Sequence, residues 1–410
     1  MTDIWPEVRL AELCNSIDYG YTASASSTSV GPRFLRITDI VNGPIDWKTV
    51  PFCKIDDDSV EKYHLYNGDI VIARTGATTG VSAYISEPPT AVFASYLVRL
   101  KIGTRADARF ISYSLKSDIF WAYIRGVLGD KSAQPNASAK TMTQVKLRIP
   151  PLPEQRAIAH ILGTLDDKIE LNRRMNETLE AMAQALFKSW FVDLEPFRDQ
   201  GMEDSPLGPI PKGWRVGILG DIADNQHRGI HPKNIDPSTP YIGLEHMPRK
   251  CIGLSEWGHA KELESNKFRF KKGEFLFGKL RPYFHKVGVA PLDGVCSTDI
   301  LVIAPKEPAC FGFVLGHISS TEFVAYTDAG STGTKMPRTN WQDMACYEIV
   351  IPPQPLAESF NEVICPLADK IIRNIHQSHT LASIRDTLLP KLLSGEIRVK
   401  DAERFAERAV

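Results

Sequence analysis

The 410 residues are 43% hydrophobic and 24% charged, with a formal net charge of −1. The chain is too long for one small domain, its composition is that of an ordinary soluble protein, and no stretch has the apolar length of a membrane span. The first residues also lack the pattern of a secretory signal, so we expect a cytoplasmic protein without membrane contact.

Charge is distributed unevenly along the chain. Residues 1–150 and 205–352 each hold 17 Lys and Arg against 15 Asp and Glu, whereas residues 153–201 hold 6 against 9. Weakly basic segments permit phosphate contacts but fall short of a basic stripe, and ordinary surface charge is the alternative explanation. The seven cysteines are scattered without a C-x-x-C pair, and neither His227/His231 nor His376/His379 has an acidic or cysteine cluster beside it. We therefore expect no disulfide, no metal site and no cofactor.

Residues 1–150 have the pattern of a first globular head. Four short runs, at residues 34–37, 69–73, 81–85 and 96–100, have the length and β-branched content of strands, and turn-forming residues separate them. One or two helices are expected between residues 106 and 128. This order predicts a mixed α/β or α+β domain.

From residue 153 to about residue 192 the hydrophobic pattern takes on a helical period. Steps of four and three residues alternate along one seam, which consists of Ile158, Leu162, Leu165, Ile169, Asn172, Asn176, Leu179, Ala183, Leu186 and Trp190. This heptad pattern predicts a long helix within residues 151–195, with one apolar edge that packs against another helix. At about 1.5 Å per residue, such a helix is a rod on the order of 60 Å long.

A connector rich in Pro and Gly, at residues 196–213, ends this helix and precedes a second head at residues 214–352. Strands are expected at 241–244, 274–277, 286–289 and 300–303, and a helix at 311–326. A second long helix follows at 353–397, and a tail at 398–410. The second seam consists of Phe360, Ile364, Leu367, Ile371, Asn374, Ser378, Leu381 and Leu388, and Arg385 interrupts it.

Both seams carry an asparagine at the equivalent step, Asn172 and Asn374. A polar seam residue fixes the register of paired helices, because an amide placed opposite an apolar neighbour is left unsatisfied. Alternatively, both asparagines lie near an exposed end of the seam. The sequence does not distinguish these two interpretations.

The chain repeats itself. Pro151 of the first copy returns as Pro353, 202 positions later. This displacement holds without a gap from Pro135 and Pro337 to Leu179 and Leu381, whereas it drifts within the heads. An insertion in a long helix shifts every residue beyond it, whereas loops tolerate insertions. The constant helix length therefore indicates that the helices fix the distance between the two heads. The expected fold is two mixed α+β heads joined by two antiparallel helices in an intramolecular coiled coil with pseudo-two-fold symmetry. Duplex DNA is a partner with matching symmetry.

Five motifs resemble one known family. They are Pro-Pro-Leu-Pro-Glu-Gln-Arg at 150–156, Leu-Asp-Asp-Lys-Ile-Glu-Leu-Asn at 165–172, Phe-Lys-Ser-Trp-Phe at 187–191, the connector Gly-Pro-Ile-Pro-Lys-Gly-Trp at 208–214, and Leu-Leu-Pro-Lys-Leu-Leu-Ser-Gly-Glu-Ile at 388–397. Together they resemble the specificity subunit of type I restriction-modification systems, over essentially the whole chain.

The resemblance implies a function in defence against phage DNA. Each head would be a target recognition domain that reads one half of a bipartite sequence in double-stranded DNA. The paired helices would set the spacing and bind two methyltransferase subunits, which methylate adenine N6 from S-adenosylmethionine, and restriction-motor subunits would join through that complex.

The chain itself has no recognisable catalytic motif. Its three Pro-Pro pairs lack the context of an adenine methyltransferase motif, and no ATP-binding loop or nuclease triplet stands out. We therefore expect a non-catalytic DNA-binding subunit. The alternative is a coiled-coil adaptor whose heads bind other proteins, and a self-contained hydrolase or methyltransferase is disfavoured by the missing motifs.

Three pairs of loops are candidates for DNA contact, because Arg and Lys bond guanine or phosphate and Thr bonds phosphate. Polar turns without a DNA function explain each loop as well. The first pair holds Arg74, Thr75 and Thr78 in one head, and Lys279, Arg281, Tyr283 and Lys286 in the other. The second pair holds Lys131, Gln134 and Asn136, and Lys335, Arg338 and Asn340. The third, weaker pair holds Arg36 and Thr38, and Arg228.

Overall fold

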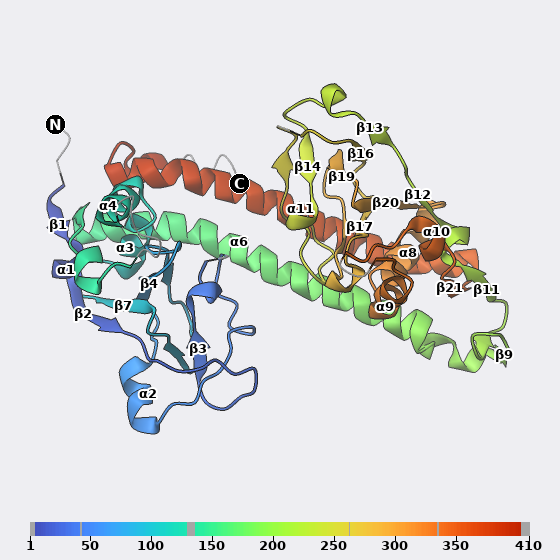
Figure 1. Cartoon of the computed structure of the whole chain (residues 1–410), viewed down its shortest axis with the longest axis horizontal. Coiled ribbons are helices and arrows are strands. Elements are labelled where there is room, and N and C mark those ends of the chain that lie inside the picture. Colours follow the sequence, from blue (N-terminus) through green and yellow to red (C-terminus); the bar gives the residue numbers. More distant parts are fainter. Residues whose placement is uncertain (1–4, 42, 129–135, 262, 334–335, 403–410) are drawn as a thin grey trace. The chain divides into compact units, whose positions relative to one another are not determined.

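The computed structural model describes residues 5–41, 43–128, 136–261, 263–333 and 336–402. The chain divides into two compact units: unit 1 comprises Met1–Glu170 with Thr380–Val410, and unit 2 comprises Leu171–His379. The long helices α6 (Leu152–Phe187) and α11 (Gln354–Ser394), both labelled in Figure 1, each contribute one segment to each unit. Each unit therefore contains one head and a segment of both helices.

The head of unit 1 consists of short strands followed by helices. Its strands are β1 (Glu7–Arg9), β2 (Cys14–Tyr19), β3 (Arg33–Leu35), β4 (Ile70–Ala73), β5 (Ser82–Tyr84), β6 (Ala91–Phe93), β7 (Leu97–Ile102) and β8 (Lys146–Arg148). Its helices are α1 (Leu10–Leu13), η1 (Ile37–Asp39), α2 (Asp57–Tyr63), α3 (Ala108–Ser114), α4 (Asp118–Leu128) and α5 (Ala139–Met142).

The head of unit 2 follows the same plan with more strands. They are β9 (Met202–Glu203), β10 (Ile210–Pro211), β11 (Arg215–Ile218), β12 (Ala223–Asn225), β13 (Gly229–Ile230), β14 (Pro240–Ile242), β15 (Gly258–His259), β16 (Lys267–Phe270), β17 (Phe275–Gly278), β18 (Val287–Val289), β19 (Gly294–Ser297), β20 (Ile300–Pro305) and β21 (Glu348–Ile351). Its α-helices are α7 (Leu219–Ile222), α8 (Phe311–Ile318), α9 (Thr321–Ala329) and α10 (Trp341–Ala345). Short helical turns are η2 (Lys188–Val192), η3 (Glu195–Gln200), η4 (Pro232–Asn234), η5 (Leu244–His246), η6 (Pro282–Phe284) and η7 (Pro308–Cys310).

The central sheets of the two units have matching strand orders. Unit 1 contains the antiparallel sheet β2-β7-β4-β5, and unit 2 contains the antiparallel sheet β12-β20-β17-β18. The central strands β4 and β17 are apolar and buried throughout, as expected for strands covered on both faces. Each unit also has a parallel pair of strands: β3 and β6 form a two-stranded sheet, whereas β14 and β19 lie within the five-stranded sheet β13-β16-β19-β14-β15. A further antiparallel pair, β1 with β8 and β11 with β21, holds the beginning of each head against the strand that precedes its long helix.

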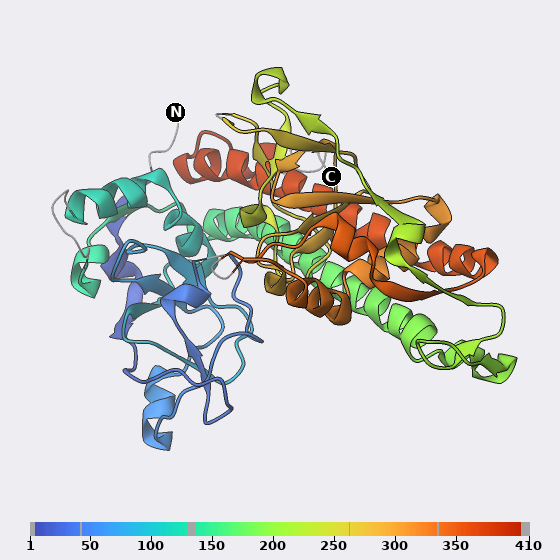
Figure 2. The ribbon, with the colours of Figure 1, turned by 45° about the vertical axis from the view of Figure 1, so that its right-hand side comes forward.

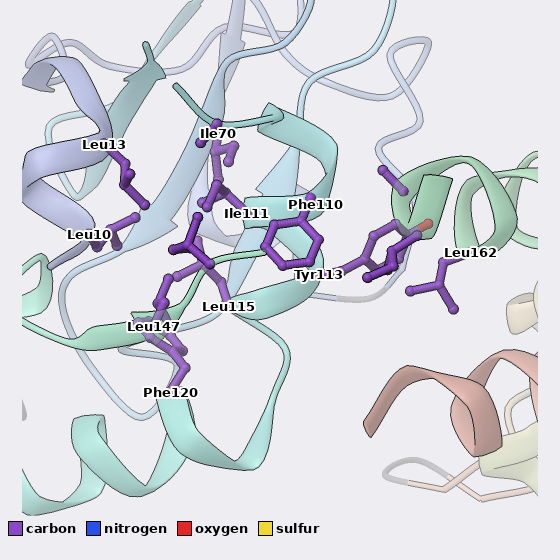
Figure 3. Packing of buried hydrophobic residues seen from close by; sticks show 14 of the residues in the cluster. Leu10, Leu13, Ile70, Phe110, Ile111, Tyr113, Leu115, Phe120, Leu147 and Leu162 are labelled. Atoms are coloured by element: carbon purple, nitrogen blue, oxygen red, sulfur yellow. The ribbon is translucent and has the colours of Figure 1, made fainter. Parts of the chain in front are cut away.

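The core of unit 1 joins the head to both long helices. Leu162 and Leu165 of α6 lie in one buried cluster with Leu381 and Leu388 of α11, and the early part of α6 lies beside the late part of α11 in Figures 1 and 2. Figure 3 shows the head side of this cluster, where Tyr113 of α3 is directed toward α6. The segments of α6 and α11 are therefore part of the hydrophobic core of the head.

Polar groups hold α3 onto the helices in unit 1. Arg109 donates two hydrogen bonds to Asp167, at 2.5 and 3.1 Å, and Tyr113 donates one to Asp166 at 2.6 Å. Arg385 of α11 donates to the other oxygen of Asp166 at 2.7 Å, so the residue that interrupts the second seam has an ionic partner. We call these five residues the ionic joint. Burial raises the pKa of Tyr113, and the neighbouring charge of Asp166 raises it further, so the hydroxyl remains a donor.

In unit 2 the equivalent contact is made by aromatic rings. Phe187 of α6 lies 6.3 Å from Phe313 of α8, ring centroid to ring centroid, and 6.4 Å from Phe360 of α11. Phe191 lies 4.7 Å from both Phe313 and Phe360, and His317 lies 4.9 Å from Phe187. We call these five residues the aromatic joint. Burial lowers the pKa of His317 to about 3, so its imidazole is neutral among these rings.

The seam asparagines are both buried, each with 1% of its surface exposed. Asn172 donates to the carbonyl oxygen of Asn374 at 3.4 Å and to Gln377 at 3.0 Å, and Asn374 donates to Asn176 at 2.8 Å. The interpretation that they lie at an exposed end of the seam is therefore wrong. Their amides bond across the two helices within unit 2.

The apolar seam residues lie within α6 and α11, and most of them are buried. Ile158, Leu162, Leu165, Phe360, Ile364, Ile371, Leu381 and Leu388 have 4% or less of their surface exposed, whereas Ile169, Leu179, Leu186 and Leu367 are partly buried against the same clusters. None of the helices in the described ranges has the length and apolarity that crossing a membrane requires.

Candidate nucleic-acid interface

In unit 1 the loop that leaves β4, residues 74–80, lies against the segment that precedes α5. Thr75 forms an isolated bridge with Asn136, and the amide of Ala137 donates to the carbonyl oxygen of Arg74 at 3.0 Å. The guanidinium of Arg74 donates to Asn136 at 3.4 Å and lies 4.9 Å from the ring of Tyr19. The structure thus brings together residues from the first and second predicted pairs of loops.

Unit 2 has the same backbone arrangement where β17 ends. Leu280 forms an isolated bridge with Arg338, and the amide of Thr339 donates to the carbonyl oxygen of Lys279 at 3.1 Å. The amide of Arg281 adds a bond to the carbonyl oxygen of Pro337 at 2.7 Å. Lys279 and Arg338 therefore occupy the positions that Arg74 and Asn136 occupy in unit 1.

A third segment joins each arrangement, and the sequence did not single it out. In unit 1 it is the turn at residues 95–96 between β6 and β7, where the carbonyl oxygen of Tyr96 accepts from the amide of Arg74 at 3.0 Å. In unit 2 it is the turn at residues 298–299, where the carbonyl oxygen of Asp299 accepts from the amide of Lys279 at 2.9 Å. The sequence predicted Tyr96 as the first residue of a strand, whereas β7 begins at Leu97, and it placed Asp299 directly before a predicted strand. Neither pattern reveals the neighbours of the turn.

Arg36 and Thr38 also adjoin this region in unit 1. They line a pocket of about 350 Å³ with residues that include Thr22, Ser95 and Tyr96. Asp39 accepts from Nε and Nη2 of Arg36, at 3.0 and 2.8 Å, and thereby fixes the direction of the guanidinium. Because two of its five N–H donors are used in this way, Arg36 keeps donors for another acceptor.

The pairing of Arg36 with Arg228 as equivalent sites is wrong. Arg36 follows β3 and opens η1, and the element in that position of unit 2 is η5, which follows β14. Arg228 instead forms a partly buried ion pair with Glu274, which immediately precedes β17. It therefore lies at the opposite end of β17 from Lys279.

The remaining predicted residues of unit 2 differ in their surroundings. Tyr283 is 51% exposed, whereas Lys286 donates to the carbonyl oxygen of Leu244 at 2.5 Å, and burial lowers its pKa. Asn340 caps α10 by accepting from the amide of Asp343 at 2.9 Å, so its carbonyl oxygen already has a partner. Thr78 of unit 1 donates within its own loop, to the carbonyl oxygen of Thr75 at 3.5 Å. Lys131, Gln134 and Lys335 lie outside the described residues.

The loop after β17 has an unusual backbone. Arg281 and His285 have φ angles of 51°, in the left-handed region, although neither is glycine. Such conformations cost on the order of 1 kcal/mol each and persist where the surroundings enforce them, commonly at functional sites. In the loop after β4 of unit 1, the residues at the corresponding positions with positive φ angles are Gly76 and Gly80. Among the described residues no group of His, Cys, Asp and Glu is arranged to hold a metal ion.

Comparison with known proteins identifies relatives of this chain. A family model described as a type I restriction modification DNA specificity domain matches residues 3–181. The specificity subunit of the type I restriction enzyme MjaIX of Methanocaldococcus jannaschii is 31% identical over 309 residues, which cover 72% of this chain and 70% of the relative. The specificity subunit of HindI of Haemophilus influenzae is 22% identical over 465 residues, covering 96% and 99%.

A solved structure supports the same fold over nearly the whole chain. The type I restriction-modification S subunit of M. genitalium superposes with a TM-score of 0.59 at 14% identity, covering 96% of this chain and 97% of that protein. At this identity the likeness concerns the fold, a mixed α/β structure with long helices.

Proposed function

This chain belongs to the family of type I restriction-modification specificity subunits, the non-catalytic DNA-recognition components of their enzymes, and from that premise we propose that each head reads one half of a bipartite target in double-stranded DNA. The reading surface in each head consists of the loop after β4 or β17, the segment before α5 or α10, and the turn before β7 or β20.

One observation supports this assignment most strongly. The three segments make the same backbone hydrogen bonds in both units, but their side chains differ: Arg74, Asn136 and Tyr96 in one unit, and Lys279, Arg338 and Asp299 in the other. A shared scaffold with different donors and acceptors is what two heads need to read two different half-sites, because base edges are distinguished by hydrogen-bond pattern.

We also propose that α6 and α11 form one antiparallel coiled coil that fixes the interval between the half-sites. In unit 1 the early seam of α6 packs with the late seam of α11, and in unit 2 the late part of α6 packs with the early part of α11. Asn172 and Asn374 then set the register, since a slip would leave buried amides unpaired. The corresponding domains are 1–150, 151–195, 196–213, 214–352, 353–397 and 398–410, related by a pseudo-two-fold axis.

The partners follow from this layout. The duplicated helices offer two similar surfaces, so they would bind two adenine-N6 methyltransferase subunits, and through them the restriction subunits. The complex would act on DNA in the cytoplasm.

The experiment is to map N6-methyladenine across the genome of cells that express the methyltransferase with and without this chain. A bipartite motif with a constant spacer should appear only when the chain is present. Binding of the purified complex to that motif should weaken steeply with salt, because each phosphate contact contributes a slope of about −0.9 to log affinity against log salt. A target whose spacer is one base pair longer should lose specific binding. If affinity depended neither on salt nor on spacer length, the proposed spacing function would be refuted.

A further inference from the structure

The turn that precedes β7 in unit 1 carries the most exposed large hydrophobic side chain among the described residues. Tyr96 has 60% of its surface exposed. Its backbone is fixed, since its carbonyl oxygen accepts from Arg74 and the amide of Leu97 donates to Ala94 at 2.9 Å. An exposed side chain on a turn whose backbone is hydrogen-bonded is available for contact with a partner.

Residues predicted to contact DNA lie on two sides of Tyr96. On one side Tyr96 lines the 350 Å³ pocket with Arg36 and Thr38. On the other side it adjoins the loop after β4, through its bond to Arg74. Tyr96 therefore adjoins two predicted DNA-contact sites that are far apart in the sequence. The pocket volume lies at the lower end of the range of about 300–1,000 Å³ for ligand sites.

The equivalent turn in unit 2 carries a residue of different chemistry. Asp299 accepts from Nε of Arg338 at 3.2 Å, and the two side chains are 30% and 46% exposed. A carboxylate in this position fixes the direction of an arginine and can itself accept from the amino group of cytosine. A tyrosine offers an apolar face to the thymine methyl group and a hydroxyl to a base edge.

From this correspondence we propose that the turn before β7 and β20 determines sequence specificity, with Tyr96 contacting a base in one half-site and Asp299 selecting a base in the other. The inference rests on the proposed function and extends it to a position that the sequence pattern did not mark. The pocket beside Tyr96 admits the group that the base presents, with Arg36 and Thr38 as donors.

The test uses the full chain with its methyltransferase and compares methylation motifs between variants. Tyr96→Ala should relax recognition at one position of one half-site, and discrimination against a duplex with that base replaced should fall about tenfold, the lower range for loss of one base contact. Tyr96→Phe should retain discrimination if the ring makes the contact and lose it if the hydroxyl does. Asp299→Ala should change only the other half-site.

Tyr66→Ala is the matched control. Tyr66 is also exposed, at 47%, but precedes β4, at the opposite end of that strand from Arg74. This variant should leave both half-sites unchanged. The unaltered half-site in each test variant also reports that the chain is folded and assembled.

The possible outcomes distinguish failure of the proposed function from failure of the specificity assignment to Tyr96 and Asp299. A wild-type complex that methylates no defined bipartite sequence would overturn the proposed function itself. A defined wild-type motif that Tyr96→Ala and Asp299→Ala both leave unchanged would overturn only this inference. A uniform loss of methylation at both half-sites, without relaxed sequence choice, would also contradict it, because a specificity residue acts on one half.

Discussion

The ionic joint of unit 1 and the aromatic joint of unit 2 make the same connection with different chemistry. In both, a helix of the head packs against α6 and α11, and a glycine permits close approach. A Cβ at Gly163 of α6 would lie 2.5 Å from Cζ of Arg109, and a Cβ at Gly316 of α8 would lie 2.0 Å from Cδ2 of Phe187. In unit 1 the glycine belongs to the long helix α6, whereas in unit 2 it belongs to the head helix α8. The close approach of head helix and long helix is thus preserved, although different residues produce it.

The chemical difference between the two joints can be traced to a substitution between the two copies of the repeat. Asp166, the acceptor for Tyr113 and Arg385, corresponds to Ala368 in the second helix, where the displacement is 202 residues. Ala368 is buried with 5% of its surface exposed. The two units should therefore respond differently to mutation, pH and salt, and hydrogen exchange can measure this because it reports the opening of each segment separately.

The largest effect is expected from truncating a ring in the aromatic joint. Phe360 is fully buried and contacts Phe187, Trp190 and Phe191, so Phe360→Ala should destabilise unit 2 by about 3–5 kcal/mol through lost burial and a cavity. Protection of α8 should fall while that of α3 is unchanged. Met182→Ala, at a residue of α6 that is 47% exposed, is the control and should have little effect. Equal loss in both units would show that the joints are not independent.

A smaller effect is expected from replacing Asp166 with the alanine that unit 2 carries in the same register. Asp166→Ala leaves the Tyr113 hydroxyl and the Arg385 guanidinium without this acceptor; Tyr113 is buried, and the side chain of Arg385 is partly buried. Since the charges retain some solvent contact, we expect a loss of about 2 kcal/mol, confined to unit 1. Asp369→Ala changes an exposed carboxylate at the register of Asp167 and serves as the control. An unchanged exchange rate in α3 would show that the core alone holds this joint.

These joints also show how far the sequence predicts the fold. The heptad steps located both long helices. Eight of the strands were located, because apolar runs between turn residues have a strong signal, whereas others, such as β1, β2 and β16, were not predicted. The joint partners were not predicted, since nothing local connects Arg109 with Asp167 or Phe187 with Gly316. Likewise Tyr96 reaches Arg74 only through the sheet order β7-β4, whereas Arg74 itself was predicted because basic residues after a strand are visible in the sequence.

Acid should weaken unit 2 selectively through His317. Its folded pKa of about 3 lies below the ordinary value of 6.5, so the unfolded state binds the proton more readily. The contribution of neutral His317 to the stability of unit 2 is therefore fully present above pH 6.5, and it is lost as the pH falls toward 3. Full linkage gives about 1.4 kcal/mol per pH unit, and because the residue keeps some exposure we expect about 1 kcal/mol between pH 7 and pH 5. His317→Phe should remove this slope in α8, and a slope that persists would assign it to another group.

The smallest effect distinguishes the joints by salt. In the ionic joint, Arg109 and Asp167 have side chains that are 31% and 65% exposed, so added ions screen their attraction, whereas the rings of the aromatic joint carry no charge to screen. At 1 M salt the screening length falls to about 3 Å, and we expect unit 1 to lose about 0.5 kcal/mol relative to low salt. Hydrogen exchange of α3 and α8 at both salt concentrations measures the difference, and Asp166→Ala should reduce the response of α3. If α8 responded as strongly as α3, the effect would come from general ion binding, and the chemical contrast between the joints would have no energetic consequence.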